Sequence, residues 1–183
     1  GEKVFLKEIS LLFKGSISRI DFVEDLINGM WTLQKNDTNE ACIINIRENK
    51  PNKESSFRYW FKNYFIARYK DAFVTAEEEK GKGRIDLKIS HKVFGEKIIE
   101  FKGWWNQDKK STPEQICSYL TDFEKDGYIF MINHLKLKGI TLDYKDLVTQ
   151  STANFVTGSW KEHKFENTDM IYYESKHKFG VKE

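Results

Sequence analysis

One stretch, residues 83–105, constrains the fold more than any other part of the chain: GRIDLKISHKVFGEKIIEFKGWW. Its two runs of alternating residues, 84–90 and 97–104, predict two β-strands joined by a short turn. Charged side chains, Asp86 and Glu100 among them, stand in the middle of these strands. They belong either to the solvated face of an outer hairpin or to a group of reactive side chains that the sheet presents.

Alternation along the strands decides where these charges point, because successive side chains face opposite sides of a sheet. Asp86 lies opposite the apolar residues of its strand, which are Ile85, Leu87 and Ile89. Glu100 and Lys102 lie opposite Phe101. If the strands pair, both carboxylates and the lysine can share one face. Two carboxylates suit Mg²⁺, and a neighbouring lysine could orient a water molecule or stabilise charge on a phosphate.

A helix just downstream favours the reactive interpretation over the solvated one. Pro113 predicts the first turn of a helix that runs to about residue 124. Gln115 and Tyr119 are four residues apart and therefore share one helix face. The other side of the helix is apolar and can pack on the sheet, through Ile116, Leu120 and Phe123.

The remaining elements predict an α/β fold. An aromatic stripe predicts a helix over residues 57–69. A strand over 72–79 precedes the two charged strands, and an apolar run over 128–133 predicts a buried strand after the helix. The predicted order is therefore helix, three strands, helix, strand.

Both ends of the chain add elements to this order. Helical spacing of apolar residues predicts two helices, over 4–13 and 17–31. A C-terminal hairpin is predicted over 160–176. We place an N-terminal helical appendage at 1–50 and the main domain at 51–183. Because the chain begins with Gly1, it is either a domain cut from a longer protein or carries a cloning scar.

Composition excludes several classes of protein. Apolar residues make up 39% of the chain with only two prolines, which argues against global disorder. Cys42 and Cys117 form no closely spaced pair, so we expect neither a disulfide framework nor a zinc ribbon. We expect the protein to work in a reducing cytoplasm. No apolar run reaches the roughly 18 residues that span a bilayer. The net charge is +2, but residues 80–110 hold nine Lys or Arg against four Asp or Glu.

The charged residues and the downstream helix together resemble the PD-(D/E)xK nuclease superfamily. The resemblance rests on Asp86, on the run of Glu100, Phe101 and Lys102, and on Gln115 followed by Tyr119. The last element is similar to that of the RecB-type branch. The resemblance covers about residues 54–133. It implies a restriction-endonuclease-like fold, with an αβββαβ core and a mixed central sheet flanked by helices, and divalent-metal hydrolysis of nucleic-acid phosphodiester bonds.

Site roles follow from the resemblance. Asp86 and Glu100 would bind Mg²⁺ or Mn²⁺, with the carbonyl of Phe101 as a backbone ligand. Lys102 would serve the attacking water, and Gln115 would orient active-site groups or the nearby phosphate.

Many members of the superfamily add a glutamate from the first core helix. Glu54 is the candidate beside that helix, and Glu77 on the first strand is the alternative. The proline in the name of the superfamily is replaced here by Ile85, as in many members.

Nucleic-acid contacts are expected after the third strand. Trp104 could stack on a base, and Lys109 and Lys110 could hold phosphates. Tyr119 is a further candidate contact. Alternatively, the tryptophan closes the core.

These observations lead us to expect a magnesium-dependent endonuclease or exonuclease that cleaves DNA, with RNA as the other possible substrate. Bacterial defence or repair, as part of a longer protein, is the expected context. One alternative is a nucleic-acid-binding module of the same fold that does not cleave. A second is a protein-interaction domain that works through its N-terminal helices.

Overall fold

The computed structural model describes residues 21–35, 53–80, 83–121, 124–133, 138–151, 154–165 and 171–178. The chain forms two compact units, Gly1–Lys35 and Asn36–Glu183. The domain boundary predicted at residue 50 lies outside the described residues, as does the helix predicted over 4–13. Both therefore stay predictions.

The described part of the first unit is helix α2, Phe22–Lys35. The carboxylate of Asp21 accepts hydrogen bonds from the N–H groups of Val23 (3.0 Å) and Glu24 (3.3 Å). An aspartate in this place satisfies the free N–H groups of the first turn and complements the helix dipole. The helix predicted over 17–31 is present, but it ends four residues later than predicted.

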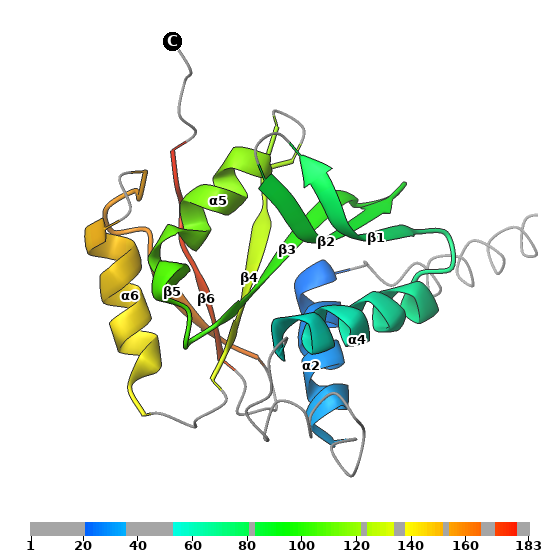
Figure 1. Ribbon diagram of the computed structural model, residues 1–183, viewed down its shortest axis with the longest axis horizontal. Coiled ribbons are helices and arrows are strands. Elements are labelled where there is room, and N and C mark those ends of the chain that lie inside the picture. The colour runs from blue at the N-terminus through cyan, green and yellow to red at the C-terminus, as the bar shows by residue number, and fades with distance from the viewer. Residues whose placement is uncertain are drawn as a thin grey trace, which may run out of the picture. The chain divides into compact units, whose positions relative to one another are not determined.

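The second unit is an α/β structure with one four-stranded mixed sheet (Figure 1). Its strands are β1 (Phe73–Lys80), β2 (Gly83–His91), β3 (Gly95–Gly103) and β4 (Gly127–Ile132), and they lie side by side in that order. The first three strands are antiparallel, and β4 runs parallel to β3. The chain crosses from β3 to β4 through the short helix η1 (Gln107–Ser111) and helix α5 (Thr112–Tyr119). The predicted α/β class and order of elements are confirmed.

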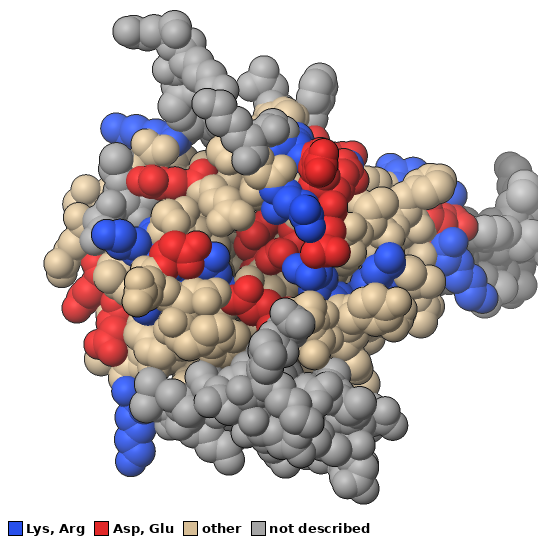
Figure 2. All heavy atoms as spheres, viewed as in Figure 1, with Lys and Arg blue, Asp and Glu red and all other residues tan. Residues whose placement is uncertain are grey.

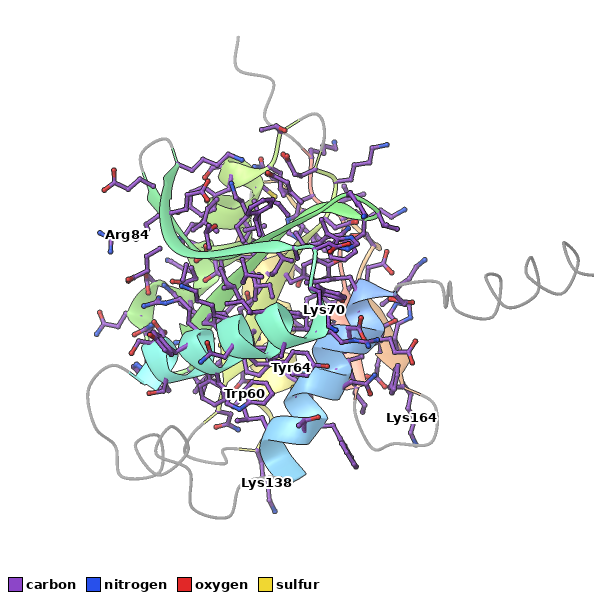
Figure 3. The ribbon with its side chains drawn as sticks, turned by 90° about the vertical axis from the view of Figure 1, so that its right-hand side faces the viewer. Trp60, Tyr64, Lys70, Arg84, Lys138 and Lys164 are labelled. Carbon is purple, nitrogen blue, oxygen red and sulfur yellow. The ribbon has the colours of Figure 1, made fainter. Side chains whose placement is uncertain are left out.

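Helix α4, Lys53–Arg68, packs on one face of this sheet through its aromatic side chains (Figure 3). Phe61 is fully buried, and its ring lies 5.6 Å from that of Phe101 and 5.1 Å from that of Phe130, centroid to centroid. Trp60 and Tyr64 stack on each other on the side of the helix away from β1. The helix begins four residues before the predicted start, which places Glu54 in its first turn.

Helix α5 packs on the opposite face, against β3 and β4 (Figures 1 and 3). Ile116 is buried so closely over Gly127 that a Cβ at this glycine would lie 2.1 Å from the Ile116 side chain, so a larger residue there would clash. The helix was predicted to reach residue 124. It ends at Tyr119, because Leu120 adopts an extended backbone.

The C-terminal part of the second unit holds helix α6 (Ile140–Ser151) and a separate two-stranded sheet. Strands β5 (Lys161–Lys164) and β6 (Ile171–Glu174) form this antiparallel hairpin, which confirms the predicted one. Its turn lies outside the described residues. Among the helices that the structure describes, none has the length and apolar character needed to cross a membrane.

Candidate active site

The ladder between β2 and β3 stops where the two predicted carboxylates meet. Its last backbone pair is Leu87 with Ile99, and the same register sets Asp86 opposite Glu100. Beyond that pair, side chains replace ladder bonds. The N–H of Asp86 donates to Glu100 at 3.2 Å, and the N–H of Phe101 donates to Asp86 Oδ2 at 2.9 Å. Each carboxylate is therefore fixed by the backbone of the opposite strand.

Glu100 is a buried acid, with 4% of its surface exposed. Burial raises its pKa to about 8, and the negative charge of Asp86 adds to the rise. Lys102 acts in the opposite direction. Desolvation and a like charge both disfavour an ionised carboxylate, and together they outweigh the positive charge of Lys102 at Glu100.

Gln115 reaches this pair from α5, as predicted. Its Nε2 donates to Glu100 Oε2 at 3.3 Å and to the hydroxyl of Tyr119 at 3.1 Å. Ile116 is buried on the sheet and Leu120 is partly buried, so the predicted orientation of the helix is confirmed. The contact between Gln115 and Glu100 is the one that a plain amphipathic helix would not make.

Tyr119 does not lie where a nucleic acid could reach it. It is 3% exposed and packs in the core with Ile85 and Ile98. Its hydroxyl donates to the carbonyl of Arg84 at 3.2 Å. The ring therefore offers no surface for a base, and the predicted nucleic-acid contact is replaced by a contact that positions Gln115.

Lys102 lies in the site, but its ammonium group has an acidic partner that the sequence analysis missed. Nζ donates to Asp108 Oδ2 at 3.0 Å, and the lysine side chain is 14% exposed. Asp108 belongs to η1, the next element after the third strand. Asp108 could have been noticed in the sequence because it is one of only four acidic residues in the basic stretch 80–110.

Glu54 connects the start of α4 to the end of β3. Its carboxylate accepts hydrogen bonds from the N–H of Gly103 and from the side-chain amide of Asn106. Burial raises the pKa of Glu54, and the charges of Asp86 and Asp108 add to the rise. The structure therefore brings the predicted helix glutamate to the edge of the site.

Arg58 is the site residue that the sequence analysis did not find. Its Nη1 donates to Asp86 Oδ1 at 2.7 Å, and its Nη2 donates to Glu77 Oε1 at 3.0 Å. A residue four positions after Glu54 shares its helix face. Because the helix was predicted to begin at residue 57, this relation was not seen.

Glu77, the alternative acid, interrupts β1. The register pairs its two neighbours with β2 and omits Glu77, which lies opposite Asp86 with a φ of 58°. This left-handed backbone costs a residue with a side chain roughly 1–2 kcal/mol. Such strain is found most often at functional sites.

The expected nucleic-acid contacts are only partly on the surface. Trp104 is half-buried against Tyr144 of α6, with ring centroids 6.5 Å apart, and the Lys109 ammonium lies 4.8 Å from the Trp104 centroid. Lys110 is exposed, and Trp105 is 38% exposed. Acidic side chains gather near the centre of the view over the sheet, with basic ones among them (Figure 2).

The chemistry of the carboxylate pair fits a hard divalent cation. In the described residues, no three or more His, Cys, Asp or Glu side chains form a group that could hold a metal ion. Glu54, predicted as a further ligand, therefore does not form a three-carboxylate group with Asp86 and Glu100. A cation held by Asp86 and Glu100 alone would need water or phosphate oxygens to complete its shell, an arrangement that Mg²⁺ accepts. The raised pKa of Glu100 is consistent with this, because a cation would offset the repulsion between the acids. The N–H of Phe101 binds Asp86, which holds this residue beside the pair, and its carbonyl stays the backbone ligand that the resemblance implies.

Glu100 should make the stability of the metal-free protein fall as the pH rises. Its folded-state pKa of about 8 exceeds the ordinary 4.5, so between these values the folded chain keeps a proton that the unfolded chain loses. The free energy of unfolding should decrease through this window, on the order of a few kcal/mol. Glu100→Gln should remove the decrease, so thermal melts of the two proteins should diverge as the pH rises.

His177 is the control for this comparison. Burial lowers the pKa of His177, so its contribution to the free energy of unfolding rises with pH, opposite to that of Glu100. It is present in both proteins and cancels in the difference. Parallel melting curves across the window would contradict the assignment of the raised pKa to Glu100.

Comparisons with known proteins place the chain in one family. Residues 20–136 match the family described as "Domain of unknown function (DUF8371)", and the chain belongs to that family. This region contains α2, the four-stranded sheet and every residue of the candidate site. The searches of curated proteins and of solved structures gave no match.

Proposed function

We propose that the second unit is a restriction-endonuclease-like domain and acts as a divalent-metal-dependent deoxyribonuclease. The element order α4, β1, β2, β3, α5, β4 supports the fold, since it is the αβββαβ order that the resemblance implies. The observation that carries the function is the pair of Asp86 and Glu100, set opposite each other where the ladder ends. Glu100 is buried and accepts a hydrogen bond from Gln115 of the next helix.

Each side chain has a part in the proposed reaction. When bound, a cation would supply charge stabilisation for the phosphate and a more acidic water. Asp86 and Glu100 would hold it, and Gln115 would keep Glu100 in place through its amide. Lys102 would orient the attacking water after exchanging its contact with Asp108. Its ammonium would also stabilise charge that develops on the phosphate.

DNA is the proposed substrate, with RNA as the alternative. Strand β3 carries Glu100 and Lys102. The segment that follows it holds the partly exposed Trp105, and Lys109 and Lys110 of η1. Basic residues displace counterions from phosphates, and an exposed aromatic ring can stack on an unpaired base. Trp104 is half-buried and contacts both Tyr144 and the ammonium group of Lys109.

The direct test is to incubate the protein with supercoiled plasmid and with linear single-stranded DNA and RNA. Each reaction is run with Mg²⁺, with Mn²⁺ and with EDTA. Cleavage that requires the cation supports the proposal, and the products separate internal from terminal cutting. Intact substrates under all conditions, with a protein shown to be folded, would contradict it.

Gln115→Ala should lower the cleavage rate about 10-fold or more, a barrier increase of at least roughly 1.4 kcal/mol, with the fold retained. Gln115 is only partly buried, and its amide contacts Glu100 and Tyr119. Ser118→Ala is the matched control on the same helix, since its exposed hydroxyl donates to the backbone carbonyl of Gln115 and leaves the Gln115 amide group untouched. Equal cleavage rates for the two variants would mean that Gln115 has no role in the reaction.

A binding module that does not cleave is the second candidate, and two contacts favour it. Arg58 neutralises Asp86, and Asp108 neutralises Lys102, so both reactive groups have protein partners. Such a module would bind nucleic acid in EDTA as tightly as in Mg²⁺ and would leave it uncut. The same incubations, with a binding assay alongside, separate the two candidates.

A further inference from the structure

Two guanidinium groups converge on one carboxylate beside the acidic pair. Arg58 of α4 donates Nη2 to Glu77 Oε1 at 3.0 Å, and Arg84 of β2 donates Nη1 to the same oxygen at 3.4 Å. The other arm of Arg58 binds Asp86 at 2.7 Å. Arg58 therefore bridges the candidate metal site and Glu77.

These groups lie at the rim between the buried site and solvent. The side chain of Arg58 is 16% exposed, that of Glu77 is 49% exposed and that of Arg84 is 58% exposed. Arg84 extends outward from the sheet at the edge of the molecule (Figure 3). An exposed ion pair such as Glu77 with Arg84 adds little to stability, so the fold does not account for it.

The backbone of Glu77 gives a second reason to look beyond the fold. Its φ of 58° is the only positive value among the described residues other than glycine. The strained residue carries the carboxylate on which both arginines converge. Strain of this kind persists where the surrounding contacts hold it, as in ligand clamps and switches.

We propose that Arg58 and Arg84 form a binding site for a backbone phosphate of the nucleic-acid strand, which Glu77 occupies when no strand is bound. Guanidinium groups bind phosphate and carboxylate oxygens in the same geometry, so the Glu77 carboxylate stands where a phosphate oxygen would. This inference rests on the proposed function and deepens it. The site places a phosphodiester next to Asp86.

Glu77 is then an internal competitor of the substrate. A strand that enters must displace the carboxylate from both guanidinium groups and also meets its negative charge. Removing that charge while keeping the size of the side chain should strengthen binding. Removing Arg84 should weaken it and release fewer counterions.

The test is fluorescence anisotropy with labelled single-stranded and duplex oligonucleotides in EDTA, where no metal-dependent cleavage occurs. Glu77→Gln should bind about 3- to 10-fold more tightly than wild type. Arg84→Gln should bind more weakly, with a salt slope smaller by about 0.9 on duplex or about 0.7 on single strands.

Asp71→Asn is the matched control, because it changes the net charge as Glu77→Gln does. Asp71 is exposed, pairs with Lys92 at 3.1 Å and lies six residues before Glu77, about 20 Å along an extended chain. A purely global charge effect would move both variants equally and would overturn the proposal.

Two further outcomes separate this inference from the function on which it rests. An unchanged salt slope in Arg84→Gln, with a wild type that cleaves DNA, overturns the phosphate site and leaves the nuclease proposal standing. A wild type that neither binds nor cleaves nucleic acid overturns both. Arg84 is exposed, so its variant keeps the test valid even if Glu77→Gln fails to fold.

Discussion

Glu100→Gln should reduce metal-dependent cleavage by about 10²–10³-fold or more, and Asp86→Asn should do the same. Each change removes the negative charge that a cation needs and keeps the size of the side chain. The fold should persist, because an amide oxygen can still accept the N–H from the opposite strand. Gln115 can rotate its own amide to meet the new one. Cleavage of plasmid with Mn²⁺ and a thermal melt measure the two effects.

Glu96→Gln is the control for this prediction. It makes the same change on the same strand, four residues earlier, where Glu96 is partly exposed and contacts Ser90 and Lys88. Mn²⁺ should raise the melting temperature of wild type and of Glu96→Gln but not of Glu100→Gln. Full activity in Glu100→Gln or Asp86→Asn would contradict the assignment of the metal to this site.

Lys102→Ala should lower turnover by about 10²–10⁴-fold and leave the affinity for Mn²⁺ largely unchanged. An ammonium group cannot ligate a cation, so its loss removes charge stabilisation and orientation of water without removing a ligand. Calorimetric titration with Mn²⁺ and single-turnover cleavage separate these two effects.

Lys97→Ala controls for the loss of a lysine from the same strand. Lys97 is 15% exposed and pairs with Asp126 at 3.0 Å, which matches the burial and pairing of Lys102. It should retain its cleavage rate. A loss of Mn²⁺ affinity in Lys102→Ala as large as in the carboxylate variants would mean that Lys102 supports the structure of the site instead.

The strands and the position of the acidic pair could be predicted because alternation is a local property of the sequence. Ile85, Leu87 and Ile89 are all fully buried, and the N–H of Asp86 donates to Glu100. The helix after them could be predicted from Pro113. The spacing of Gln115 and Tyr119 predicted their shared helix face, and the family resemblance predicted the position of Gln115 beside the acids.

Contacts that depend on where helices begin and end could not be predicted. Glu54 and Arg58 enter the site because α4 starts at Lys53, four residues before the predicted start. Asn52, which precedes Lys53 in the sequence, is a residue type that favours helix starts, and this signal was not used. The burial of Tyr119 depends on the close approach of α5 to β2, which spacing along one helix does not reveal. The partners Asp108 and Glu77 depend on tertiary geometry for the same reason.

Glu54, which joins the start of α4 to the end of β3, has a consequence for synthesis on the ribosome. The candidate site takes its residues from Glu54 to Gln115. Strand β3 also pairs with β4, which comes after Gln115 in the chain. Domains fold as units, so a nascent chain that stops before β4 holds the acids without the assembled site. A protein that cuts nucleic acid would thus remain inactive until all four strands of the sheet have left the ribosome.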